Sequence, residues 1–367
     1  MRLGVVGGGI AGSLLAWRLV QDWPGSDVEL LCEQVPGARG GGDATAWSGG
    51  LVRGFEPDLP RSQMAADSLT KLRGIPSLAA ASQYREIGAV YLSEATPQTP
   101  LAPRVAAVRQ RLPGSVRVVA ADELSEAYGW AGVPAGSVAV AERVAGYASL
   151  GGLRQLLIRE LASSGVLVGG GTVTQVRPGP RGSVTCHVGP ARHDYDAVVL
   201  AVGRWTPALL TRSGLPADPY RTKLIQYGIY GAEGMDLPTF VDETTGLYGR
   251  AAHDGHVLLG VPTDQWDVDP DRPPPDLEGQ ARAKDLASAR FPTLRVGALE
   301  QFVTSADAYT PTPGLALRRV LAGGSRLFTF TGGSGGAAKT SLAASHRAVQ
   351  QLRSAVDGTD LAIKDVR

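Results

Sequence analysis

The sequence predicts an α/β protein, and three observations predict this class. The first thirty-five residues have the pattern of a strand, a glycine turn, a helix and a second strand. An apolar run at 196–203 indicates a buried strand that ends in a turn. The segment 326–352 has the pattern of a strand, a glycine loop and a helix. Together these patterns indicate a parallel sheet covered by helices.

The N-terminal unit carries a glycine fingerprint. Gly7, Gly9 and Gly12 form G-x-G-x-x-G between the first expected strand and its helix. Such glycines permit a tight turn, let the backbone approach a pyrophosphate and let the helix pack closely on the strand. Glu33 ends the second expected strand, where a carboxylate binds ribose hydroxyls and disfavours a 2′-phosphate. The motif therefore predicts a Rossmann-type dinucleotide site, without separating NAD from FAD.

The middle of the chain mixes helical and strand patterns. Apolar residues at helical spacing predict helices at 61–72, 101–111 and 151–164. Strands are expected at 87–92, 166–168, 172–176 and 183–188, with a β-rich stretch at 222–262 and a proline-rich loop at 269–275.

The first and last thirds resemble each other more than either resembles the middle, which predicts a discontinuous nucleotide-binding domain. We expect this domain to comprise residues 1–82, 145–220 and 304–367. An α+β substrate domain with a mixed or antiparallel sheet is expected from residues 83–144 and 221–303.

Composition excludes several classes of protein. A formal charge of +1 supplies no overall field for nucleic acid or acidic lipid, so neither is an expected partner. The chain enters a strand at once, without a signal peptide pattern or a membrane-spanning apolar run, so we expect a cytoplasmic protein. Two isolated cysteines, Cys32 and Cys186, predict neither a disulfide framework nor a metal site. Nothing in the sequence predicts an oligomeric state.

Several patches resemble the flavoprotein family of D-amino acid, glycine and sarcosine oxidases. The resemblance follows nearly the whole chain in order but is specific only in the N-terminal unit and in residues 48–53, 196–207, 307–313 and 332–339. It implies FAD as the cofactor. In the sarcosine-oxidase branch a cysteine that links the flavin stands about where this chain has Asp307, so noncovalent binding is expected here.

The resemblance also implies which residues contact FAD. Small residues after Glu33 would let backbone donors reach the flavin, and the C-terminal glycine loop would place a helix N-terminus where reduced flavin is negative. The expected contacts are Gly7, Gly9, Ile10, Ala11, Gly12, Glu33, Gln34, Ser48, Gly49, Gly50, Leu51, Val173, Val202, Gly203, Trp205, Gly333, Ser334, Gly335, Gly336, Ala337 and Lys339.

Two cations match residues that bind the substrate carboxylate in the sarcosine-oxidase branch. These are Arg53, whose guanidinium suits bidentate binding, and Lys339, in the first turn of an expected helix. A lysine there opposes the helix dipole, which favours a functional role. The structural alternatives are an exposed or packing arginine and an ordinary helix lysine.

The resemblance predicts oxidation of an amino acid or N-substituted glycine, with hydride transfer to flavin N5, imine hydrolysis and reoxidation by O2. Secondary metabolism is one setting for such a reaction. Leu258 stands where the sarcosine-oxidase branch has a lysine that assists oxygen reduction. A dehydrogenase for amines or imino acids with another electron acceptor is therefore the alternative.

The sequence lacks the motifs of two other classes of flavoenzyme. An aromatic hydroxylase normally has a Gly-Asp flavin motif in the last third of the chain, whereas the pair Gly42-Asp43 occurs early. A disulfide reductase has two neighbouring cysteines after the first helix, and this chain has no such pair. A nucleotide-binding protein without catalysis stays open, because a fold does not determine a function.

The remaining polar and aromatic side chains of note have structural interpretations. Tyrosines are common in half-buried strands, so we expect packing roles for those in the β-rich stretch. Two neighbouring charges before Gly146 are expected to form a solvated pair. The tyrosines are Tyr227, Tyr230 and Tyr248, and the pair is Glu142 and Arg143.

Overall fold

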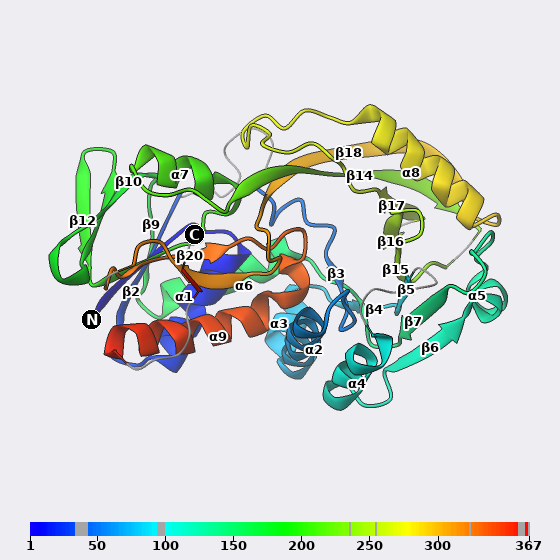
Figure 1. Ribbon diagram of the computed structural model, residues 1–367, viewed down its shortest axis with the longest axis horizontal. Coiled ribbons are helices and arrows are strands. Elements are labelled where there is room, and N and C mark those ends of the chain that lie inside the picture. The colour runs from blue at the N-terminus through cyan, green and yellow to red at the C-terminus, as the bar shows by residue number, and fades with distance from the viewer. Residues whose placement is uncertain are drawn as a thin grey trace.

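The computed structural model describes residues 1–33, 43–93, 100–234, 236–253, 255–322, 324–358 and 364–365. The described chain forms two large sheets with helices packed against them, so the expected α/β class is confirmed (Figure 1). Within the described residues, no helix is both long and apolar enough to cross a membrane.

A seven-stranded sheet contains the N-terminal unit. Its strands, in spatial order, are β21 (Lys364–Asp365), β19 (Ala316–Arg319), β20 (Leu327–Thr331), β13 (Ala197–Leu200), β1 (Arg2–Val6), β2 (Asp27–Cys32) and β9 (Leu167–Gly170). The strands from β20 to β9 are parallel, and β19 is antiparallel to β20. Parallel strands that end at one edge of a sheet place their following loops together, which is where open α/β sheets bind ligands.

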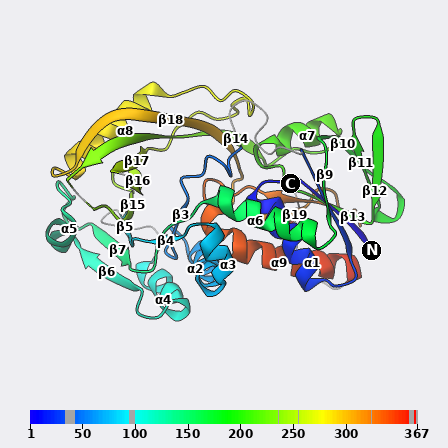
Figure 2. The same ribbon diagram turned by 180° about the vertical axis from the view of Figure 1, so that it is seen from behind.

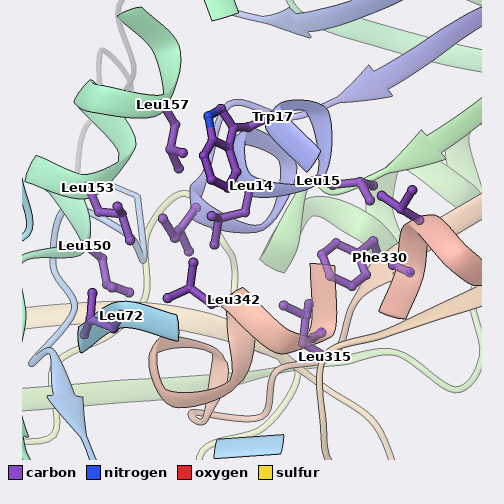
Figure 3. Close-up of a cluster of buried hydrophobic side chains, with 14 of the residues drawn as sticks. Leu14, Leu15, Trp17, Leu72, Leu150, Leu153, Leu157, Leu315, Phe330 and Leu342 are labelled. Carbon is purple, nitrogen blue, oxygen red and sulfur yellow. The ribbon is translucent and has the colours of Figure 1, made fainter. Parts of the chain in front are cut away.

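Helices contribute to the largest core cluster, and three of them pack on this sheet: α1 (Ile10–Asp22), α6 (Leu150–Ser163) and α9 (Ala337–Asp357). Helix α2 (Leu59–Gly74) packs on α9, and α3 (Pro76–Ala81) and α4 (Leu101–Arg111) pack on α2. Helix α1 packs against both α6 and α9. Apolar side chains of α1 are buried in this cluster, and Figure 3 shows Leu14 and Trp17 of α1 among leucines of the neighbouring helices. This packing fixes the N-terminus of α1 at the sheet edge.

An eight-stranded sheet forms the second layer. Its strands, in spatial order, are β18 (Arg295–Tyr309), β14 (Arg221–Glu233), β17 (His256–Gly260), β16 (Tyr248–Ala252), β15 (Thr239–Asp242), β5 (Ala89–Ser93), β7 (Val138–Glu142) and β6 (Val116–Ala120). Neighbours are antiparallel except β15 and β5. The long ribbon of β14 and β18 arches away from the first sheet in both views (Figures 1 and 2).

Short elements complete the described chain. A sheet of β10 (Val173–Pro178), β11 (Val184–Val188) and β12 (Ala191–Tyr195) lies beside α7 (Thr206–Arg212). Another joins β3 (Leu51–Val52), β8 (Gly146–Tyr147) and β4 (Arg85–Glu86). The remaining helices are α5 (Ala121–Tyr128), α8 (Leu277–Arg290), η1 (Pro180–Gly182) and η2 (Gly203–Trp205).

Candidate active site

A cavity of about 980 Å³ lies where the two layers meet. Its walls come from the carboxyl ends of β1, β2, β13 and β20, from β14 and β18, and from the loop 43–51. Ligand pockets are commonly of this size, and an α/β sheet usually binds its ligand at this edge.

The expected FAD contacts gather around this cavity. Those within the described residues all line it except Gly12, which supports the glycine turn from below. Gln34 lies outside the described residues. The structure therefore brings these residues, which come from distant parts of the sequence, to the wall of one cavity. That they contact FAD stays a prediction.

The N-terminal turn has room for glycine alone at two positions. Gly7 has a φ of +115°, and a Cβ added there would lie 2.5 Å from the carbonyl oxygen of Ala201. A Cβ on Gly12 would lie 1.9 Å from the carbonyl oxygen of Gly7. Gly9 caps α1 without a side-chain hydrogen bond, and the Thr45 hydroxyl accepts the Ile10 N–H at 3.0 Å. A helix N-terminus framed by glycines and a hydroxyl fits a pyrophosphate.

The end of β2 supplies the carboxylate expected for the ribose. Glu33 lines the cavity, and one of its carboxylate oxygens accepts a hydrogen bond from the Thr172 hydroxyl at 2.6 Å. Thr172 thus orients the Glu33 carboxylate at the cavity wall.

The loop 43–51 is held at both ends by charged side chains. The Asp43 carboxylate accepts the N–H groups of Thr45 and Ala46 at 2.9 Å each and pairs with Arg154 at 2.5 Å. Arg250 donates from Nε to the Gly49 carbonyl oxygen at 2.7 Å. These contacts position Gly49 and its neighbours on the cavity wall.

The C-terminal glycine loop is tied to β18. Asp307 accepts the N–H groups of Ala308 at 2.8 Å and Gly335 at 2.9 Å. Burial raises the pKa of the Asp307 carboxyl above its ordinary value, although both amides oppose the shift. Asp307, which stands about where the sarcosine-oxidase branch has its flavin-linking cysteine, therefore holds the loop that leads into α9.

Arg53 and Lys339 come together at one carboxylate oxygen. Arg53 follows β3, and Lys339 lies in the first turn of α9. Oε1 of Glu56 lies 2.8 Å from Nη2 of Arg53 and 3.1 Å from Nζ of Lys339. All three residues line the cavity, and Arg53 and Glu56 are 7% and 3% exposed. The pair is therefore an anion-binding wall that already holds one internal carboxylate.

The electrostatics of this wall follow from its burial. Burial and the neighbouring Arg53 lower the pKa of Lys339 to about 8, against the pull of Glu56. Burial alone would raise the pKa of Glu56, but Arg53 and Lys339 hold it below its ordinary value. Glu56 is thus an ionised carboxylate between two cations at neutral pH.

The structure corrects the expectation of a solvated Glu142–Arg143 pair. Glu142 is 3% exposed and accepts the N–H groups of Gly54 and Phe55 at 2.8 Å each. Arg143 instead pairs with Glu86 at the surface. Two backbone amides offset the cost of burying the carboxylate, so Glu142 fixes the segment that follows Arg53.

Two tyrosines of an apolar cluster, Tyr227 and Tyr248, form another part of the cavity wall. Tyr227, Leu258 and Val303 are buried together, with Tyr248 packed against them. The hydroxyl of Tyr227 donates to the Trp47 carbonyl at 3.1 Å, and that of Tyr248 donates to the Gln226 carbonyl at 2.8 Å. These tyrosines therefore pack as expected while facing the cavity. Tyr230 lies in the core under α8, its hydroxyl bonded to Gln280.

Sequence reasoning gives no site role to Glu56, Glu142 or Arg250. The signal for Glu56 is its spacing three residues after Arg53, and that for Glu142 is a carboxylate that ends an apolar strand. Arg250 has no such signal, because its contact with Gly49 joins residues about 200 positions apart.

One family model matches nearly the whole chain. The profile of the DAO family, described as FAD dependent oxidoreductase, matches residues 2–351. No curated protein sequence matches.

Several solved structures share the fold. L-proline dehydrogenase from P. horikoshii has a TM-score of 0.76 at 15% identity, over 98% of this chain and 94% of that one. NikD, an unusual amino acid oxidase essential for nikkomycin biosynthesis, has a TM-score of 0.73 at 19% identity, over 98% of this chain and 95% of that one. Glycine oxidase from Geobacillus kaustophilus has a TM-score of 0.70 at 19% identity, over 99% and 96%.

Proposed function

We propose that this chain, which belongs to the DAO family of FAD-dependent oxidoreductases, oxidises an amino acid or an N-substituted glycine. The observation that carries the proposal is the convergence of Arg53 and Lys339 on the cavity wall. A guanidinium and an ammonium side by side in a buried wall suit a carboxylate, the group that such substrates share.

The cavity suits FAD, which we propose binds noncovalently. The glycine turn and the first turn of α1 would hold the pyrophosphate, and Glu33 would hold the ribose. Residues 48–51 and 333–337 would line the isoalloxazine end. When bound, FAD supplies a hydride acceptor at N5 for the carbon next to a neutral amine, and the resulting imine is hydrolysed by water.

The chain's own part is orientation and exclusion of water. The wall of Arg53 and Lys339 would fix the carboxylate, so that the substrate carbon has a defined place in the cavity. Tyr227 and Tyr248, backed by the buried Leu258, would present apolar surface to the rest of the substrate. If the amine binds neutral, no side chain has to remove its proton.

The electron acceptor has two candidates. O2 is the acceptor that the proposal favours, as for an oxidase. A dehydrogenase with another acceptor is supported by Leu258, a buried apolar residue 1% exposed at the position expected for an oxygen-activating lysine. The rate at which substrate-bleached enzyme regains its yellow colour in air separates the two.

The test of the proposed function is the variant Arg53→Ala in the FAD-loaded enzyme. It removes a buried, charge-assisted contact to the substrate carboxylate, so we expect carboxylate affinity to fall roughly 10- to 100-fold. Affinity is measured from the change in flavin absorbance on titration with a panel of amino acids and N-alkyl glycines under anaerobic conditions.

Two further variants make the result specific. Arg53→Lys keeps the charge without the planar fork and should restore part of the affinity. Arg212→Ala removes another cation that lines the cavity, one on α7, and should change affinity little. Unchanged carboxylate affinity in Arg53→Ala, with FAD still bound, contradicts the proposed function.

A further inference from the structure

We propose that Glu56 is a positioning residue of the anion site: its carboxylate holds Arg53 and Lys339 together and preserves the positive charge that a substrate carboxylate meets. The inference rests on the proposed function of these two cations and adds a third member to their site. Neither the glycine fingerprint nor the resemblance assigns a role to Glu56.

The geometry shows one oxygen serving two cations. Oε1 of Glu56 lies 2.8 Å from Arg53 and 3.1 Å from Lys339. Arg53 reaches this position with its Nε bonded to the Phe55 carbonyl at 2.9 Å and its guanidinium over the Tyr91 ring at 5.0 Å. Without the carboxylate, two like charges would face each other in a buried wall, which is unfavourable.

Hydrogen bonds to the backbone hold Glu56 and the residue after it in place. Its N–H donates to the Ser62 hydroxyl, and its carbonyl oxygen accepts from the same hydroxyl, both at 3.0 Å. Arg104 donates to the next carbonyl, that of Pro57, at 3.0 Å. The Glu56 side chain is 4% exposed, so this ion pair differs from the screened pairs of a protein surface.

The charges of Arg53, Lys339 and Glu56 indicate which substrates the anion-binding wall accepts. Two cations and one carboxylate leave one net positive charge, provided that Lys339 is protonated. A single substrate carboxylate neutralises that charge. A simple amine leaves it uncompensated, and two carboxylates exceed it. We therefore expect the wall to select substrates that present one carboxylate to it.

Protonation of Lys339 makes the proposal measurable. Burial, Arg53 and Arg61 lower its pKa and Glu56 raises it, with a net value of about 8. Lys339 therefore attracts a carboxylate below this pH and loses its charge as the pH rises through about 8. Replacing Glu56 with glutamine removes the raising contribution, so Lys339 should lose its proton at a lower pH.

The experiment compares FAD-loaded wild type with Glu56→Gln over a range of pH. Competitive acetylation with acetic anhydride, read by mass spectrometry, reports the unprotonated fraction of Lys339 without relying on catalysis. We expect its midpoint to fall by about one pH unit or more. Propionate, titrated by flavin absorbance, should bind Glu56→Gln roughly threefold or more tightly at low pH, where a repelling charge is gone, and more weakly at high pH.

Two variants control for a general loss of structure. Glu29→Gln is the same substitution at another buried and ion-paired carboxylate, one that pairs with Arg2 away from the cavity lining, and should leave the Lys339 midpoint in place. Glu56→Asp keeps the charge at a greater distance and should move the midpoint in the same direction by less. If Glu56→Gln fails to fold, the direction of the Glu56→Asp shift decides.

The outcomes separate this inference from the proposed function. Equal Lys339 midpoints in wild type and the Glu56 variants overturn the inference. Propionate curves that cross between low and high pH support both proposals, since a purely structural defect lowers affinity at every pH. A shifted midpoint without any propionate binding supports the role of Glu56 and overturns the proposed function of the wall.

Discussion

Glu142 illustrates how one buried side chain positions another. Its carboxylate sits at the end of β7 and accepts two amides of the segment after Arg53. Gly54 has no side chain and that of Phe55 is apolar, so neither residue can itself supply another acceptor for these N–H groups. The orientation of Arg53 therefore depends on a residue almost ninety positions away in sequence.

The variant Glu142→Ala should destabilise the protein. It leaves two buried N–H groups without their acceptor, which costs about 3 kcal/mol in the free energy of unfolding. Urea denaturation measures this value. Glu142→Gln keeps one acceptor oxygen and should cost less. A stability equal to wild type in Glu142→Ala would contradict the structural role given to these hydrogen bonds.

Single residues also show where sequence reasoning stops. Arg53 and Lys339 can be named from the sequence because each resembles a family position. Glu56 and Glu142 have no such resemblance, and their roles depend on which way a buried side chain points. Hydrophobic periodicity says little about that direction, so a strand-ending carboxylate is interpreted as solvated unless its partners are known.

Among elements, the first strand, turn and helix are determined most directly by sequence. Close approach of α1 to the sheet requires Gly12, since its Cβ would lie 1.9 Å from a backbone oxygen. Gly12→Ala should therefore destabilise the protein by at least about 4 kcal/mol or prevent folding. Soluble yield and urea denaturation measure the effect.

A glycine in another helix provides the matched control. Gly74 ends α2, and a Cβ there meets nothing within 4 Å. Gly74→Ala should be neutral or stabilising by up to about 1 kcal/mol, because alanine restricts the unfolded chain and favours helix. Equal stabilities of the Gly12 and Gly74 variants would show that the close approach at Gly12 has no energetic consequence.

Elements with clear periodicity are predicted well from sequence, and the others are not. Helix α4 has the expected bounds, and α6 differs from expectation by one residue at each end. Helix α8 and strand β18 are not predicted. Helix α8 buries mainly the small side chains Ala283 and Ala287, which leave a weak apolar stripe. The first half of β18 is an exposed sheet edge without hydrophobic alternation.

At the scale of the whole molecule, the two large sheets divide the chain in a discontinuous way. Strands of the seven-stranded sheet come from residues 2–32, 167–200 and 316–365, and those of the eight-stranded sheet from 89–142 and 221–309. We propose on this basis that the first sheet belongs to a cofactor-binding domain and the second to a substrate domain. The exact boundaries stay predictions.

The cavity between these layers makes stability depend on FAD. Its walls come from the N-terminal turn, the loop 43–51 and the C-terminal glycine loop, so a bound FAD should add contacts that link these three segments. A ligand that binds only the folded state, at about a hundredfold excess over its Kd, adds about 2.7 kcal/mol. We expect FAD to raise the Tm of the cofactor-free protein.

ADP distinguishes the two ends of the cavity in the same measurement. It offers the pyrophosphate and ribose to the glycine turn and Glu33 but offers nothing to residues 333–337. ADP should therefore raise the Tm less than FAD does at equal saturation, and proteolysis after 332 should slow with FAD alone. Equal protection by ADP and FAD would contradict our placement of the isoalloxazine beside the C-terminal glycine loop, because that loop would then gain nothing from the ring.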